Sequence, residues 1–251
     1  MQSKQILTIT FLSLLFLIQP GIFVFAADSP TVESRANQIL KQMGDYLKKA
    51  DRFTFSSEAY FEQVLKNGQK LQYNSLAKVA IQRPNRLRVD SRGDVANESY
   101  YYNGKRITHF DRRNNTYAFV KVPASIDAAI DFLAEKYGLT PPLSDLVYKD
   151  PYNILIQNVR SGAYIGLSRV RDTMCYHLAF QQDEIDWQVW IDAGWMRVPR
   201  KVVITYKKAV GVPQYMAFLS EWDFAPIFPG DLFDFSAPPN AEQVEFAPSA
   251  E

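Results

Sequence analysis

Apolar and polar side chains alternate from Phe53 to about Val120, and this pattern restricts the fold more than any other feature of the sequence. Successive side chains of a β-strand point to opposite faces, so period two is typical of strands buried on one side. Asn67-Gly68 and Asn103-Gly104 are strong two-residue hairpin signals, and Asn114-Asn115 marks a third tip. The region is therefore predicted to form an antiparallel meander with one apolar and one polar face.

The apolar phase of this meander predicts which side chains face the inside of the sheet, where they line a cavity if the covering helices leave one and are ordinary core if the helices fill it. Thr54 and Glu58 alternate with the apolar residues of the first strand, and Lys70 and Lys78 with those of the second. The charged phase must face solvent, so the apolar phase faces the inside of a curved sheet. A later strand repeats the pattern. The expected lining residues are Phe53, Phe55, Phe61, Leu71, Tyr73, Val79, Ile81, Trp187, Val189 and Ile191.

Apolar residues recur at helical spacing in two places. The first predicted helix begins at Pro30 and runs to about Ala50, with Val32 in its apolar stripe. The second runs over Ile126–Tyr137, and residues 143–158 are expected to hold one or two short helices. Each helix needs an apolar surface to cover.

Strand patterns resume after the helical insertion. They cover residues 164–170, 174–180, 187–191, 202–206 and 215–222, with a short strand expected at 232–235. No repeat or linker divides the chain. The predicted fold class is mainly β with α: a single curved antiparallel sheet of about ten or eleven strands, with helices covering its concave face.

The N-terminus has the features of a targeting segment. An apolar run over residues 6–25 is interrupted by Gln19-Pro20-Gly21 and ends at Val24 and Ala26, whose spacing fits a signal-peptidase site. We expect residues 1–26 to be a signal peptide and residues 27–251 to be one domain. The alternative is an uncleaved membrane anchor, since the run approaches spanning length. Cleavage predicts an exported, soluble protein with no transmembrane span.

Composition excludes several classes of protein. The chain has 28 Lys and Arg against 27 Asp and Glu, a net charge of +1, whereas nucleic-acid binders usually carry a large basic excess. No nucleic-acid partner is expected. One cysteine excludes an internal disulfide and a cysteine-rich zinc site.

The residues that bear chemistry are few. Cys175 and His177 share a face of a predicted strand, and their apolar neighbours favour a structural pair over a nucleophile and its base. Asp183, Glu184 and Asp186 are typical of a polar hairpin connection. No catalytic residue, metal site or cofactor is expected.

Arg83, Arg86, Arg88 and Arg92 form the densest basic patch. One interpretation is recognition of phosphate or carboxylate, to which the guanidinium fork is suited. This makes Arg83, Arg86 and Arg88 candidate head-group contacts. The other interpretation is a solvated outer sheet face, where charges alternate with Leu87 and Val89.

Two sets of motifs resemble known families. The stretch Ala80–Arg88, followed by Tyr102-Asn103-Gly104-Lys105 and His109-Phe110-Asp111, resembles exported proteins with the LolA/LolB lipoprotein-carrier fold. The second half is similar to the predicted periplasmic proteins called domain of unknown function 2092. That likeness rests on Cys175–Phe180, Asp186–Ile191, Pro199-Arg200-Lys201, Trp222, Phe233-Asp234-Phe235 and Pro238-Pro239. Together the likeness extends from about Ser34 to Phe246.

The resemblance implies a periplasmic LolA-like half-barrel. Carriers of that fold hold acyl chains in an apolar concavity, and the related RseB-type sensors detect envelope components there. The resulting hypothesis is a non-catalytic carrier or sensor for a lipid or lipoprotein acyl chain. The alternative is a structural or protein-interaction module of the envelope, with a filled core and an envelope protein as partner.

We expect the exported protein to begin at Ala27, because the site after Ala26 is the one that fits the signal peptidase. N-terminal sequencing of the protein from its native host checks this. Recovery of a chain with Met1 in the membrane fraction would contradict it.

Overall fold

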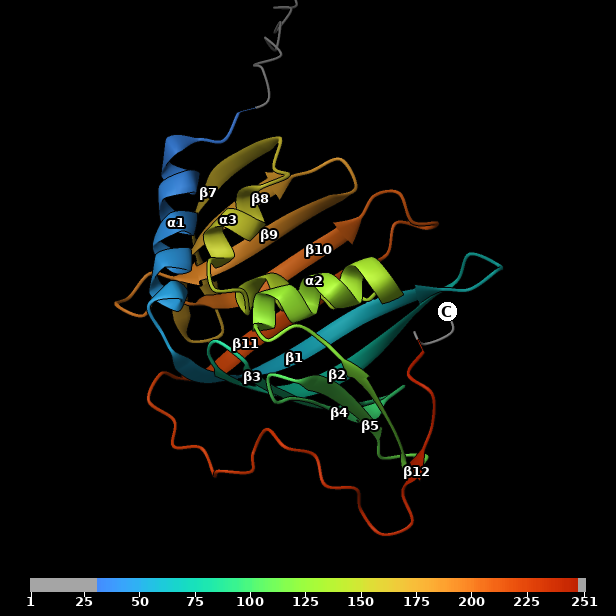
Figure 1. The fold of residues 1–251 in the computed structure, drawn as a ribbon. Coiled ribbons are helices and arrows are strands. Elements are labelled where there is room, and N and C mark those ends of the chain that lie inside the picture. The colour runs from blue at the N-terminus through green and yellow to red at the C-terminus, as the bar shows by residue number, and fades with distance from the viewer. Residues whose placement is uncertain (1–30, 248–251) are drawn as a thin grey trace, which may run out of the picture.

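The computed structural model describes residues 31–247. Its strands are β1 (Arg52–Val64), β2 (Lys70–Gln82), β3 (Arg86–Gly93), β4 (Asn97–Tyr102), β5 (Arg106–Asp111), β6 (Thr116–Lys121), β7 (Ser161–Val170), β8 (Thr173–Gln181), β9 (Ile185–Asp192), β10 (Pro199–Tyr206), β11 (Gln214–Asp223) and β12 (Glu242–Gln243). They form one twelve-stranded sheet in the order β12-β6-β5-β4-β3-β2-β1-β11-β10-β9-β8-β7 (Figure 1).

The sheet consists of two meanders placed side by side. Strands β1 to β6 form one meander, β7 to β11 form the other, and the antiparallel pairing of β1 with β11 joins them. The short β12 pairs with β6 in parallel. Within residues 31–247 the sheet stays open, with β12 and β7 at its edges. The prediction of one curved, mainly antiparallel sheet is confirmed.

Helices cover the concave face of the sheet (Figure 1). They are α1 (Ser34–Lys48), α2 (Ile126–Tyr137) and α3 (Pro151–Ile156), with a 3-10 turn, η1, at Ser144–Leu146. The buried stripe of α1 is Ala36, Ile39, Leu40, Met43 and Leu47. A Cβ added at Gly44 would lie 2.5 Å from Cβ of Tyr152, so only glycine lets α1 and α3 pack this closely. No helix within 31–247 is long and apolar enough to cross a membrane.

Helix α2 has the ends that its sequence favours. The Ser125 side chain accepts a hydrogen bond from the Ala128 backbone N–H at 3.2 Å, which caps the N-terminus. Gly138 ends the helix with φ 66°, and its N–H donates to carbonyls of the last turn. The buried Ile126 and Ala129 face the sheet. The predicted bounds of α2 are confirmed.

The first helix begins later than predicted. It starts at Ser34, while Val32 lies in a parallel bridge with Gly162 next to β7. The Glu33 carboxylate accepts a hydrogen bond from the Tyr164 backbone N–H, and the Glu33 N–H donates to the Gly162 carbonyl. These bonds hold residues 32–33 extended against the edge strand. Pro30 and the signal-peptide segment lie outside the described residues.

Two turns also differ from the prediction. The first hairpin has a three-residue loop, Lys66–Gly68, because the Leu65 N–H already donates to the Gln69 carbonyl and Gly68 takes φ 85°. The prediction of a strand at residues 232–235 is wrong. Residues 229–234 form successive turns around Pro229-Gly230, and the tail pairs with the sheet later, at β12.

Arg83 joins the helical layer to the sheet. Its Nη1 donates to the carbonyls of Leu47 and Ala50 at 3.2 and 2.7 Å, at the end of α1. Its Nη2 donates to the carbonyls of Val147 and Tyr148 at 3.3 and 2.7 Å, just after η1. One guanidinium therefore satisfies carbonyls from two helix ends that have no partner inside a helix.

The convex face carries a second, smaller core. Val170, Cys175, Trp190 and Val203 are buried there, with Met216 and Phe218 packed beside them. Trp190 alternates with Val189 and Ile191 of the main core, which places it on the opposite face. The Lys201 ammonium lies 4.6 Å from the Trp190 ring centroid. Burial raises the pKa of the Cys175 thiol to about 11, with the Asp192 carboxylate adding to the shift.

We expect Cys175→Ala to lower the free energy of unfolding by about 1 kcal/mol, because it opens a small cavity in this second core. Ligand binding should be unchanged, because the thiol is buried on the convex face. Chemical denaturation checks the stability. Loss of binding at an unchanged melting temperature would contradict the structural role of Cys175.

Candidate functional site

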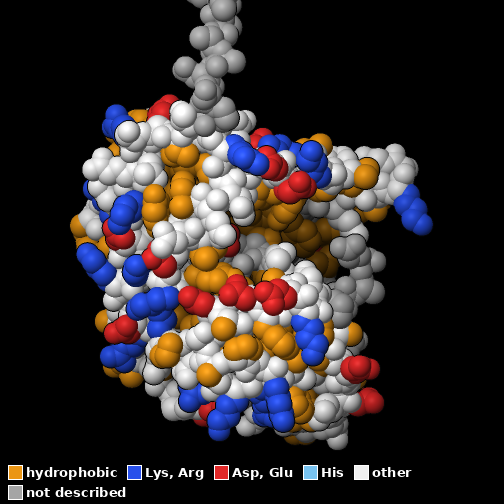
Figure 2. Space-filling view, turned by 45° about the horizontal axis from the view of Figure 1, so that its top comes forward, with side chains coloured by type: hydrophobic (Ala, Val, Ile, Leu, Met, Phe, Trp, Pro, Cys, Tyr) orange, Lys and Arg blue, Asp and Glu red, His pale blue; other side chains and the backbone are white. Residues whose placement is uncertain are grey.

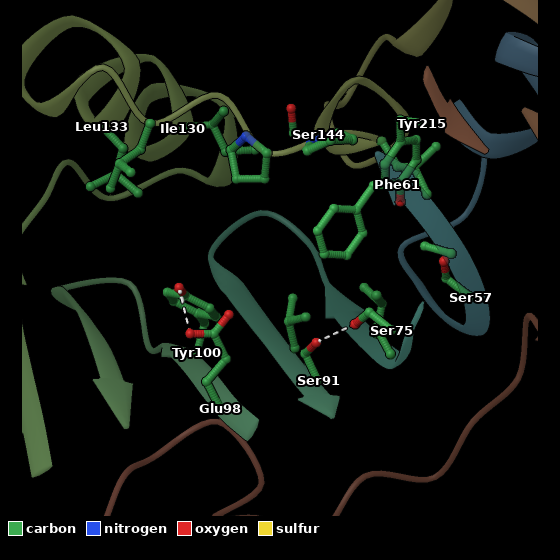
Figure 3. Close-up of a pocket in the computed structure, with 18 of the residues that line it drawn as sticks. Ser57, Phe61, Ser75, Ser91, Glu98, Tyr100, Ile130, Leu133, Ser144 and Tyr215 are labelled. Carbon is green, nitrogen blue, oxygen red and sulfur yellow. Dashed lines mark hydrogen bonds between the residues drawn. The ribbon is translucent and has the colours of Figure 1, made fainter. Parts of the chain in front are cut away.

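A cavity of about 600 Å³, here called the main cavity, lies between the concave face and the helical layer. Figure 2 shows a hollow with an apolar inner wall, and Figure 3 shows side chains of the sheet and of the helical layer on opposite sides of the space. Its lining residues on the sheet belong to β1–β5, β10 and β11, and include Phe55, Phe61, Val79, Leu87, Val89, Tyr100 and Ile107. The walls are mainly apolar, as in most small-molecule sites.

Cross-strand register sorts the concave face into rows. One row consists of large side chains that pair directly across the strands: Phe53, Ile81, Leu87, Tyr102 and Ile107. The next row is also large at most positions: Phe55, Val79, Val89, Tyr100 and His109. Phe53 and Ile81 are fully buried core, whereas Leu87, Tyr102 and Ile107 of the same row also line the cavity.

In the following two rows every side chain except that of Glu98 is small. One consists of Ser57, Ala77, Ser91 and Glu98, and the other of Ala59, Ser75 and Gly93. The Ser75 and Ser91 hydroxyls bond to each other at 3.0 Å across these rows (Figure 3). Because these small side chains stand next to the rows of large side chains, they leave a depression in the surface of the sheet. The main cavity lies over this depression.

The opposite wall comes from the helical insertion. Ile130 and Leu133 of α2 face the cavity, and the segment from Leu139 to Ser144 continues the wall (Figure 3). Leu143 also lines a second chamber of about 200 Å³, so its side chain separates the two spaces. Phe246 of the C-terminal tail closes one side, with its ring 5.1 Å from that of Tyr137.

Among the described residues that line the main cavity, the charged side chains are two carboxylates, those of Glu62 and Glu98. Glu62 is neutralised by the Lys70 ammonium at 3.0 Å. Glu98 instead contacts the His109 imidazole, with Nε2 to Oε2 at 2.7 Å. The Tyr100 hydroxyl donates to the same Oε2 at 3.3 Å (Figure 3). Burial, and secondly the Glu98 charge, raise the pKa of Tyr100.

The residues predicted to line the cavity fall into three groups. Phe55, Phe61 and Val79 lie on the wall of the main cavity. Trp187 and Val189 lie on the wall of the second chamber. Phe53, Ile81 and Ile191 are packed in the core, while Leu71 and Tyr73 lie outside the lining, toward the end of the first hairpin.

The structure places the three predicted head-group arginines away from the cavity. Arg83 is occupied by helix-end carbonyls, as described above. Arg86 and Arg88 alternate with the cavity residues Leu87 and Val89, so they point to the convex face. There Arg86 donates to the Asn103 carbonyl, and Arg88 pairs with Asp90 at 2.7 Å. The described lining of the main cavity holds carboxylates and no arginine, and the placement of Arg86 and Arg88 agrees with the interpretation of a solvated outer face.

The other candidate residues make structural contacts. His177 stacks on Trp190 with ring centroids 4.0 Å apart, and its Nε2 contacts the Gln188 amide oxygen at 2.9 Å. Asp183 and Asp186 form ion pairs with Arg160 and Lys207, at 2.7 and 2.8 Å. Within the described residues, no three His, Cys, Asp or Glu side chains gather in a way that could hold a metal ion.

Sequence reasoning missed the small residues of the floor. Ser75, Ser91 and Glu98 were not predicted to line the cavity. The available signal was their spacing. In an antiparallel hairpin the inward phase of one strand opposes that of the next, so small residues at matching distances from a turn form a row.

Several solved structures are similar in overall path to this chain. An uncharacterized conserved protein from Thermus thermophilus is 11% identical, with 84% of this chain and 99% of that chain covered, at a TM-score of 0.49. The Mycobacterium tuberculosis lipoprotein LppX is 10% identical, with 77% of this chain and 97% of that chain covered, at a TM-score of 0.43. A LolA superfamily protein from Nitrosomonas europaea is 10% identical, with 80% of this chain and 97% of that chain covered, at a TM-score of 0.42. At this level of identity, no ligand or partner follows from these proteins.

No curated protein sequence matches this chain. A family model described as "Predicted periplasmic protein (DUF2092)" matches residues 36–247, which include all the strands and nearly all of the helical residues described above. The motifs Cys175–Phe180 and Asp186–Ile191 lie within the matched region. The chain therefore belongs to the DUF2092 family of predicted periplasmic proteins.

Proposed function

We propose that this protein is a non-catalytic periplasmic binding protein that holds the acyl chain of a lipid or lipoprotein in the main cavity, as a carrier or a sensor. The observation that carries the proposal is a cavity of about 600 Å³ whose floor is made of small side chains and whose walls are apolar. This volume is within the range of small-molecule sites. An acyl chain fits such walls because each buried methylene contributes about 0.8 kcal/mol.

The cavity favours ligand binding over the alternative of a filled-core module. A protein interior is normally close-packed, and an unfilled space of this size forfeits contacts along its whole lining. Phe61, Ile130 and Leu133 lie on such a lining rather than against one another (Figure 3). An apolar ligand would supply the missing contacts. An envelope protein remains a candidate donor or receiver of that ligand.

The polar groups of the cavity favour binding over catalysis. Nucleophilic catalysis by serine needs a base that is bonded to the hydroxyl. Ser75 and Ser91 bond to each other, and Nε2 of His109 contacts Glu98. Among the described residues, no cavity serine is hydrogen-bonded to an imidazole.

The direct test is mass spectrometry of lipids that co-purify with the protein from its native periplasm. We expect an acyl-containing lipid in near-stoichiometric amount. Protein that is recovered folded and free of lipid, and that takes up no fatty-acyl probe, would contradict the proposal.

Ala77→Phe should fill the cavity, because Ala77 lies between Ser57 and Ser91 in a row of small residues on the floor. We expect the affinity for a fluorescent fatty-acyl probe to fall by about tenfold or more, since the ring occupies the chain's place. Leu76→Phe is the matched control, because Leu76 is the next residue on β2 and is 40% exposed on the convex face. Equal loss in both variants would argue against a pocket on the concave side.

Truncation should separate core residues from lining residues. Phe53 is fully buried and its ring is stacked near those of Phe55, Trp222 and Phe224, so Phe53→Ala should cost about 3–5 kcal/mol of unfolding free energy. Phe61→Ala should cost about 1 kcal/mol, because one side of its ring faces the cavity and has few partner atoms. Urea denaturation measures both. Similar costs would indicate that Phe61 is ordinary core.

A further inference from the structure

The main cavity adjoins a smaller pocket of different chemistry. This pocket, of about 180 Å³, shares Tyr100, Leu139 and Phe246 with the main cavity. Its other lining residues are His109, Asp111, Thr116, Tyr117, Ala118, Val244, Glu245 and Ala247. We call it the polar niche. It lies where β5 and β6 meet the C-terminal tail, next to the Glu98–His109 pair.

We propose that the Glu98–His109 pair and the polar niche bind the head group of the ligand, and that they select a head group that donates hydrogen bonds and carries no negative charge, such as an amine or a hydroxyl. This inference rests on the proposed function, because it assumes that a chain occupies the main cavity. It adds the orientation of the ligand and its chemical class.

The distribution of charge supports this selection. Glu62, Glu98, Asp111 and Glu245 are the residues with charged side chains on the described walls of the two spaces, apart from His109. No Lys or Arg is among these lining residues. A phosphate or carboxylate head group would therefore be buried beside carboxylates and without a lysine or arginine partner, which is strongly unfavourable. In Figure 2 a row of acidic side chains also lies along one side of the hollow.

Three arginines of β3 and of the turn after β5 are bonded to other groups. Arg88 and Arg112 both contact Asp90, at 2.7 and 2.9 Å, on the convex face. Arg113 donates to the carbonyls of Gly93, Asp94 and Val95. These contacts hold the guanidinium groups away from Glu98. The sheet thus separates its positive charges from the cavity.

The geometry of Glu98 leaves an acceptor for the ligand. The bonds from His109 and Tyr100 both end on Oε2. Among the described residues, none is hydrogen-bonded to Oε1, and Figure 3 shows the carboxylate at the edge of the open space. Asp111 is different, because its carboxylate accepts bonds from the backbone N–H groups of Arg113 and Asn114 in the adjacent turn. Glu98 is therefore the carboxylate best placed to accept a charge-assisted hydrogen bond.

The test compares ligands that share one chain and differ in the head group. Laurate, dodecylamine and 1-monolauroylglycerol displace a fluorescent fatty-acyl probe from the mature protein at neutral pH, below their micelle-forming concentrations. We expect dodecylamine and monolauroylglycerol to bind about tenfold or more tightly than laurate, the gain of about one charge-assisted bond at the head group.

Glu98→Gln removes the charge and keeps the size of the side chain. We expect the preference for dodecylamine over laurate to shrink to about threefold or less, since the amide lacks the ionic part of the bond. Glu58→Gln is the matched control. Glu58 also accepts a bond from a tyrosine two residues along, Tyr60, at 2.6 Å, but it lies on the convex face. The control should keep the ranking of the wild type.

The outcomes separate the two proposals. Binding of none of the three ligands by the wild type would overturn the proposed function and this inference together. Equal binding, or tighter binding of laurate, would overturn the inference and leave chain binding intact. An unchanged preference in a folded Glu98→Gln variant would also overturn the assignment to Glu98. If that variant does not fold, the wild-type ranking decides.

Discussion

Cross-strand pairing of β1, β2, β3 and β4 sets side chains of similar size next to one another across the concave face. Phe53 pairs with Ile81, and Ser57 pairs with Ala77. The same register continues these rows of large and of small residues over the following strands. A shift by one residue would turn every one of these side chains to the other face and would destroy both the packed rows and the hollow rows. The cavity is therefore a property of the register.

A hollow of this size persists only if the surrounding layers are held apart. Arg83 fixes the end of α1 and the segment after η1 to β2, and Gly44 lets α1 and α3 pack as one unit. The rows of large side chains support the helical layer. The helices therefore pack against one part of the sheet and extend over the neighbouring part, where the cavity lies. Collapse onto Ser75 and Ser91 would break these supports.

The sequence was sufficient to predict most of the secondary structure and the curved sheet. Strong local signals carried those predictions: period-two alternation in β1 and β2, and the Gly138 stop of α2. The prediction of secondary structure failed at the start of the first helix, where long-range contacts override the local preference of the sequence. Edge strand β7 holds Val32 and Glu33 extended. The strand predicted at 232–235 failed for a local reason, because successive turns begin at Pro229-Gly230. The sequence left two interpretations of the arginines open. The structure places Arg86 and Arg88 on the convex face of β3, as the outer-face interpretation expects, while Arg83 lies between β2 and β3 and bonds to helix-end carbonyls.

The C-terminal tail packs across the convex face of the sheet. It leaves β11 in the middle of the sheet, crosses the convex face and returns to the outer edge at β12 (Figure 1). Along this path the Leu232 carbonyl accepts from Arg88, the Asp234 carboxylate accepts from Asn103, and Phe235 packs against Tyr101, Phe110 and Tyr117. These contacts fasten the tail to the convex side of β3 to β6, and they would have to break before the curvature of this part of the sheet could change. We therefore expect a bulkier occupant of the main cavity to displace α2 rather than to spread the strands.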